Sequence, residues 1–122
     1  MAWFVVLAWA AVLFGLSSIS GSRLPPVGIT FGDKLAHVVV YAILGMLCLR
    51  AMRRTTDMGT WKTGALSVLI VLGYGVSDEI HQMFVPKRSS DVLDVLADVV
   101  GGTLGVILLS RIRRRQAAER DA

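Results

Sequence analysis

Four long apolar runs, each bounded by charged or turn-forming residues, constrain the fold of this chain more than any other feature. A helix needs about 20 predominantly apolar residues to cross a bilayer, and each run reaches that length when its flanks are counted. Only 18% of the 122 residues are charged and 54% are hydrophobic, which lies outside the usual range of soluble domains. The sequence therefore predicts an all-α integral membrane four-helix bundle, with apolar cores at residues 1–18, 38–49, 65–76 and 99–110.

We expect one transmembrane domain over residues 1–110 and a basic tail over 111–122. The segment 18–32 is rich in Ser, Gly and Pro, and is predicted to be an outer loop that folds back over the bundle. The chain start lacks the basic stretch of a cleaved signal, so we expect the first helix to be retained. Cys48 has no disulfide partner and is expected to be a packing residue. The helices are expected at about residues 2–19, 33–52, 61–83 and 91–110.

The positions of the 13 Lys and Arg residues predict the orientation of the bundle. Four cations fall on one side of a four-helix topology and nine on the other, and the richer side is expected to face the cytoplasm. Both termini are then cytoplasmic. The basic tail contributes to the net charge of +4 and is expected to anchor this orientation. The charge does not indicate nucleic-acid binding. The nine cations are Arg50, Arg53, Arg54, Lys62, Arg111, Arg113, Arg114, Arg115 and Arg120.

With this topology, the start of the second helix, the end of the third and the start of the fourth meet at the outer face. Every unusual polar residue lies at one of these three helix ends, and helical spacing places the members of each set near one face. We expect them to converge in one pocket. They are Asp33, Lys34, His37 and Tyr41 on the second helix, Asp78, Glu79, His81 and Gln82 on the third, and Asp91, Asp94 and Asp98 on the fourth.

The acids of this region need a compensating partner. Asp98 lies about 10 Å below the expected surface, from about 1.5 Å of rise per residue, and an unpaired carboxylate at such depth costs about 2.5–3.5 kcal/mol. Six acids face four cations, a balance that favours a proton or a divalent cation, although no recognised metal-binding motif is present. An ion pair of Asp78 with Lys34 or Arg88 is a structural alternative. The candidate metal ligands are Asp33, His37, Asp78 and Asp94.

Gly101 and Gly105 form a small-residue face on the fourth helix. This spacing allows two helices to approach closely in lipid. The close contact is expected either within the bundle or between protomers of an oligomer.

The ordered motifs resemble those of the VanZ-like membrane protein family, which is associated with teicoplanin resistance. The motifs are Asp33-Lys34-x-x-His37, Tyr41, Ser77-Asp78-Glu79-x-x-Gln82, Arg88 and Asp94-x-x-x-Asp98, followed by Gly101 and Gly102. The resemblance implies a multi-pass protein of the bacterial inner membrane that acts in the cell envelope. The last motif often ends in Asn in this family, so Asp98 adds a negative charge.

Three functions remain open from the sequence. The first is binding of an envelope lipid or lipid-linked precursor, with Lys34, Lys87 and Arg88 holding phosphate and a link to glycopeptide resistance. The alternative is an intramembrane hydrolase or transferase, with Asp78 and Glu79 as acid and base and His37 as base or metal ligand. The second alternative is a structural accessory subunit. The expected ligand-binding residues are Asp33, Lys34, His37, Tyr41, Asp78, Glu79, Gln82, Arg88, Asp94 and Asp98.

Overall fold

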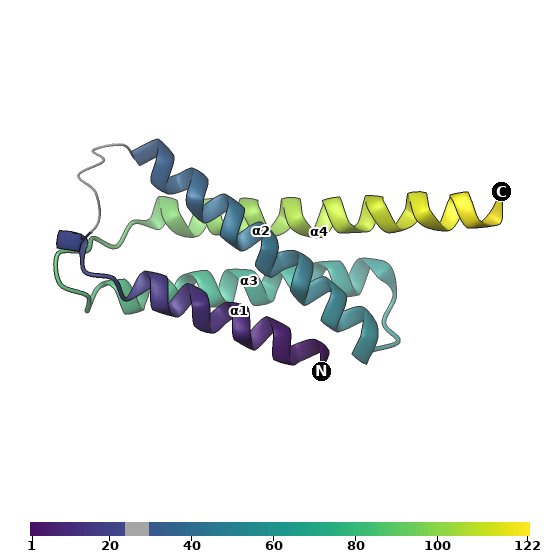
Figure 1. The fold of residues 1–122 in the computed structure, drawn as a ribbon, viewed down its shortest axis with the longest axis horizontal. Coiled ribbons are helices and arrows are strands. Elements are labelled where there is room, and N and C mark those ends of the chain that lie inside the picture. The colour runs from purple at the N-terminus through teal and green to yellow at the C-terminus, as the bar shows by residue number, and fades with distance from the viewer. Residues whose placement is uncertain (24–29) are drawn as a thin grey trace.

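The fold is built from four α-helices, of which the second crosses the third and fourth obliquely (Figure 1). A computed structural model describes residues 1–23 and 30–122, with the side chains of 1–22 and 32–122. No strand occurs in the part of the chain so described. The prediction of an all-α bundle is confirmed. The elements are α1 (Ala2–Ser17), the 3-10 turn η1 (Gly21–Arg23), α2 (Thr30–Thr55), α3 (Thr60–Gln82) and α4 (Val92–Asp121).

Three of the helices are long and apolar enough to cross a membrane, by length and composition: Gly32–Thr55 of α2, all of α3 and all of α4. The protein is therefore a membrane protein. At 16 residues, α1 is shorter than the roughly 20 residues that span a bilayer. The crossing of the membrane by α1 and the cytoplasmic location of both termini stay predictions.

The fourth helix does not end near residue 110, as the sequence analysis expects, but continues to Asp121. Residues 111–121 are mostly Arg, Gln, Ala and Glu, which favour a helix, and include no Gly or Pro that would stop it. The basic tail is therefore a helical extension. Figure 1 shows it projecting beyond the other three helices.

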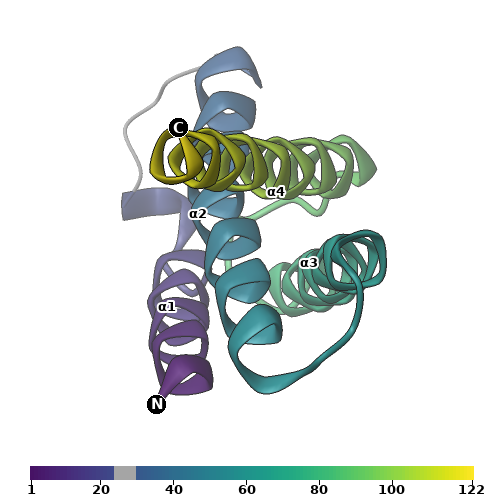
Figure 2. The same ribbon diagram turned by 90° about the vertical axis from the view of Figure 1, so that its right-hand side faces the viewer.

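The second helix lies at the centre of the bundle and contacts each of the other three (Figure 2). At one end α3 stops while α2 and α4 start; we call it the polar end. At the opposite end α2 stops and α3 starts beside the arginines of α4; we call it the basic end. The predicted 18–32 loop is described only in part. Ser20 and Gly21 donate hydrogen bonds to the Pro86 carbonyl, each 3.2 Å long, and residues 24–29 lie outside the described residues.

Glycines bring α2 and α4 into backbone contact. A Cβ atom at Gly101 would lie 2.3 Å from the Val38 carbonyl oxygen, and one at Gly105 would lie 2.0 Å from that of Ala42. Such distances exclude any side chain without a shift of the helices. The glycine face is therefore covered by α2 of the same chain, and an oligomer contact through Gly101 and Gly105 would require α2 to move away.

The apolar core lies between α1, α2 and α3. Tyr41, Leu44 and Cys48 of α2 pack there with Val71 of α3 and Leu13 of α1. Cys48 is fully buried and forms no disulfide, as a packing residue would.

Candidate functional site

The polar end gathers side chains from three helices into one group, which we call the polar cluster. Four of its acids and one amide are less than one-tenth exposed, an unusual degree of burial for such groups. The close approach of α4 to α2 places the acids of α4 against the polar face of α2. The cluster consists of Lys34, His37 and Tyr41 on α2, Asp78, Glu79 and Gln82 on α3, and Asp91, Asp94 and Asp98 at the start of α4.

Lys34 connects the start of α2 to the start of α4. Its ammonium group donates to Asp91 Oδ2 at 2.7 Å and also to Asp94 Oδ1. The suggested pairing of Asp78 with Lys34 or Arg88 is wrong, because the Asp78 carboxylate instead accepts a bond from Gln82 at 3.3 Å. Residues four apart on one helix face meet more readily than residues on separate helices.

His37 lies between two aspartates of α4. Its Nδ1 atom is 2.7 Å from Asp98 Oδ1, and its Nε2 atom is 4.0 Å from Asp94 Oδ2. Asp98 is fully buried. It fits there because Gly75 faces it from α3, where a Cβ atom would lie only 2.9 Å from Asp98 Oδ2. Gly75 is not recognisable as a site residue from the sequence, where its only signal is its place one turn before Asp78 and Glu79.

Asp91 and Glu79 hold the connection between α3 and α4. The Asp91 carboxylate caps α4 by accepting a bond from the Leu93 amide at 2.9 Å, and the Asp91 amide donates to Glu79 Oε2 at 2.8 Å. The Lys34 ammonium group, together with the Leu93 amide, lowers the pKa of Asp91 below its ordinary value. Asp91 is thus a structural residue of the cluster, and Glu79 has a structural role beside any functional one.

Several buried oxygens of the cluster have no hydrogen-bond partner among the described residues. They belong to the same group of side chains, because the Asp98 carboxylate lies near those of Asp78 and Glu79, and Tyr41 lies near Asp78. Buried polar atoms are almost always hydrogen-bonded. The cluster therefore has unused capacity to accept hydrogen bonds from a ligand, at Asp78 Oδ1, Glu79 Oε1 and Asp98 Oδ2.

Three of the four candidate metal ligands come together. Asp33, His37 and Asp94 each offer an atom, and these atoms lie within 4.8 Å of one another. When His37 Nδ1 donates its hydrogen bond to the Asp98 carboxylate, Nε2 is free to bind a metal, as in carboxylate–histidine–metal arrangements. This nitrogen and oxygen set suits a divalent transition metal. Asp78 does not belong to the group.

His81, which is expected near Asp78 at the end of the third helix, instead contacts α1, as does Tyr74. His81 Nε2 is 2.9 Å from Ser18 Oγ, and its ring stacks on Phe14 with centroids 4.4 Å apart. The Tyr74 hydroxyl donates to the Ala10 carbonyl at 2.5 Å. His81 therefore contacts α1 and does not join the possible metal ligands Asp33, His37 and Asp94. Two residues seven apart share a helix face, and the position of α1 over this face was not predictable from spacing.

Arg88, the remaining expected ligand-binding residue, lies half-buried in the turn after α3. The ion pairs of residues 1–22 and 32–122 all involve Lys34 or His37, so Arg88 has none there.

The family model described as VanZ/LLP1 matches residues 2–113 of the chain. The match includes α1, α2 and α3, most of α4 and the whole polar cluster. No curated protein and no solved structure matches the chain.

Proposed function

Because the chain belongs to the VanZ/LLP1 family and has three helices able to span a membrane, we propose that its polar cluster binds an envelope lipid. The ligand is the headgroup of a lipid or lipid-linked precursor at the outer face of the bacterial inner membrane. The observation that carries the proposal is the set of buried, unpartnered oxygens on Asp78, Glu79 and Asp98. Leaving such groups unpaired costs roughly 1–3 kcal/mol each. A headgroup that donates hydrogen bonds relieves this cost.

The charge of the cluster indicates which headgroup chemistry it recognises. Its only lysine is already paired with Asp91 and Asp94. The acids therefore select hydroxyl, amine or amide N–H groups, such as those of a sugar or a peptide. A phosphate reaches the cluster in either of two ways: through a divalent cation held by Asp33, His37 and Asp94, or through Lys87 and Arg88 in the adjacent turn.

Lipid extraction tests this proposal. The full chain is purified in mild detergent and its bound lipids are identified by mass spectrometry. We expect a lipid with a sugar, peptide or amine headgroup to be enriched over bulk phospholipid, and to be lost in Asp78→Asn and His37→Ala. The matched control is Asp57→Asn, which neutralises an exposed acid in the α2–α3 loop. Recovery of bulk phospholipid alone from the wild-type protein would refute the proposal.

The link to glycopeptide resistance belongs to the same proposal. A protein that holds a lipid-linked precursor at the outer face acts where a glycopeptide meets its target. Expression of the wild-type chain in a susceptible host is then expected to raise the inhibitory concentration of teicoplanin, and Asp78→Asn to abolish the rise at equal protein level. An unchanged inhibitory concentration with the wild-type chain would refute the link to resistance and leave the lipid-binding proposal standing.

An intramembrane hydrolase or transferase is the second candidate, favoured by the His37–Asp98 contact of 2.7 Å. A carboxylate on Nδ1 orients the ring so that Nε2 can take a proton from a substrate or water. Purified protein is incubated with total envelope lipid, with and without EDTA, and the products are followed by mass spectrometry. A product that disappears in His37→Gln, while thermal unfolding is unchanged, would establish catalysis. Loss of stability alone in all these variants would favour the structural accessory role.

A further inference from the structure

A second site lies at the basic end, away from the polar cluster. A groove of about 760 Å³ runs between the start of α3 and the middle of α4, residues 103–114. Its walls include Gly64, Val68 and Val106, and its mouth is lined by Arg111 and Arg114. The groove follows residues 60–68 of α3, a length of about 12 Å at about 1.5 Å per residue.

Small residues make the groove. A Cβ atom at Gly64 would meet only Val106 Cγ1, at 3.7 Å, so the space beside it is open. Trp61 lines the same mouth and is 80% exposed. An exposed tryptophan at the end of a membrane-spanning helix is typical of the level of the lipid headgroups. The groove therefore continues from the headgroup level into the apolar part of the bilayer.

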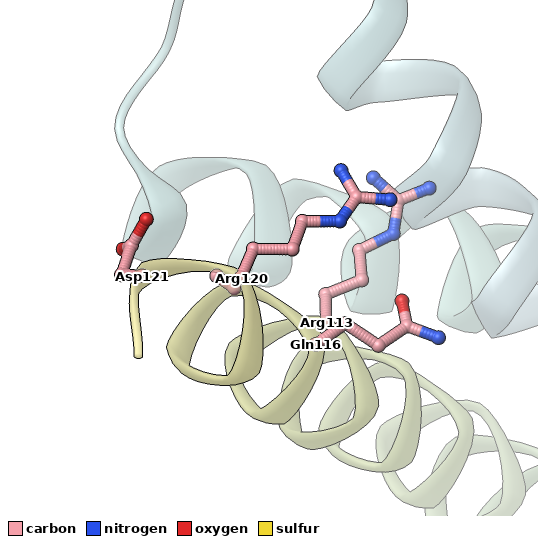
Figure 3. A pocket seen from close by; sticks show the side chains of 5 residues that line it. Arg113, Gln116, Arg120 and Asp121 are labelled. Carbon is pink, nitrogen blue, oxygen red and sulfur yellow. The ribbon is translucent and has the colours of Figure 1, made fainter.

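The mouth of the groove has an excess of positive charge. Arg53 donates a hydrogen bond to Ser110 at 3.2 Å and lies near Arg113 and Arg114. None of these arginines has an ion-pair partner in residues 1–22 or 32–122, where all ion pairs involve Lys34 or His37. Arg113 and Arg120 extend to one side of α4 (Figure 3) and line a separate hollow. Arg111 and Arg114 are the ones that face the groove.

We propose that this groove binds one anionic glycerophospholipid. An acyl chain lies along the apolar walls, the phosphate lies between Arg111 and Arg114, and Trp61 contacts the headgroup region. The charge complementarity and the apolar walls, open to the bilayer, select a lipid. Basic pockets between membrane helices bind anionic headgroups for these reasons.

Native mass spectrometry of the full chain tests the proposal, with phosphatidylglycerol and phosphatidylcholine of identical acyl chains as probes. We expect one phosphatidylglycerol to be retained in preference to phosphatidylcholine. The double variant Arg111→Gln/Arg114→Gln should weaken the preference roughly 25-fold, since each arginine near the surface contributes about fivefold. The control Arg115→Gln/Arg120→Gln removes the same charge from the same helix, outside the groove. An equal loss of the preference for phosphatidylglycerol in both double variants would indicate nonspecific attraction to the basic surface. That result would overturn the proposed site.

A second pair of variants tests the groove itself. Gly64→Leu fills it while keeping every arginine, and should abolish the retention of phosphatidylglycerol. Gly73→Leu places the same side chain on α3 where a Cβ atom meets nothing within 4 Å, and should leave retention unchanged. Retention that survives Gly64→Leu would overturn the proposal.

Discussion

The two ends of the bundle carry opposite charges, and they differ in whether those charges are buried and paired. At the polar end, acids are buried among three helices and are joined to Lys34, to His37 and to the backbone of the turn. At the basic end, the arginines of α4 are exposed except for the half-buried Arg113 and, within the described residues, they form no ion pair. Buried charges hold one geometry, whereas exposed cations remain free to meet lipid. This difference underlies the two proposals: a selective site among the paired, buried acids of the polar end, and binding of anionic lipid by the arginines of the basic end.

The glycine contact between α2 and α4 supports both ends, so disrupting it should have the largest effect. Gly105→Ala would place a Cβ atom 2.0 Å from the Ala42 carbonyl oxygen. We expect a loss of about 1–3 kcal/mol of stability, as for other overpacked positions, together with weaker ligand binding at both ends. Thermal unfolding in detergent measures the first effect. Gly73→Ala, where the new methyl meets open space, should raise stability, because alanine favours a helix.

Removing one cation from each end should separate their roles. Lys34→Met leaves Asp94 buried without its ammonium partner, and we expect a loss of about 1–3 kcal/mol. Arg114→Met removes an exposed, unpaired charge and should change stability by less than about 0.5 kcal/mol. Equal unfolding temperatures for the two variants would show that the ends do not differ in the way proposed.

The smallest expected effect is a pH dependence of the stability, caused by Asp91 at the rim of the polar end. The pKa of Asp91 is lowered by Lys34 and by the Leu93 amide, so its charged form stabilises the fold. This contribution is complete above the ordinary carboxyl pKa of about 4 and is lost as the pH falls through the lower pKa of the folded state. Asp91→Asn keeps a good helix cap and should flatten this part of the curve of unfolding temperature against pH. An identical curve for both proteins would exclude the role of Asp91.

Much of the polar cluster could be predicted from the sequence. Lys34, His37, Asp94 and Asp98 belong to apolar helices that start or end at one face, so their convergence follows from topology alone. Individual partners could not be predicted in this way. Lys34 pairs with Asp91 and Asp94 and not with Asp78, because the rotation of α2 against α4 is set by close contacts at Gly101 and Gly105. His81 leaves the cluster because α1 covers its side of α3.

The sequence by itself determined the membrane character, the helical fold and the separation of acidic and basic ends, since these depend on local composition and on the length of apolar runs. The tertiary structure alone decided which oxygens remain unpartnered, which acid orients His37, and where a groove opens beside Arg111 and Arg114. The physical reason is that hydrogen bonds and cavities depend on helix rotation and offset to within about an ångström. Helix spacing in the sequence specifies a face, but it does not specify which neighbour that face meets.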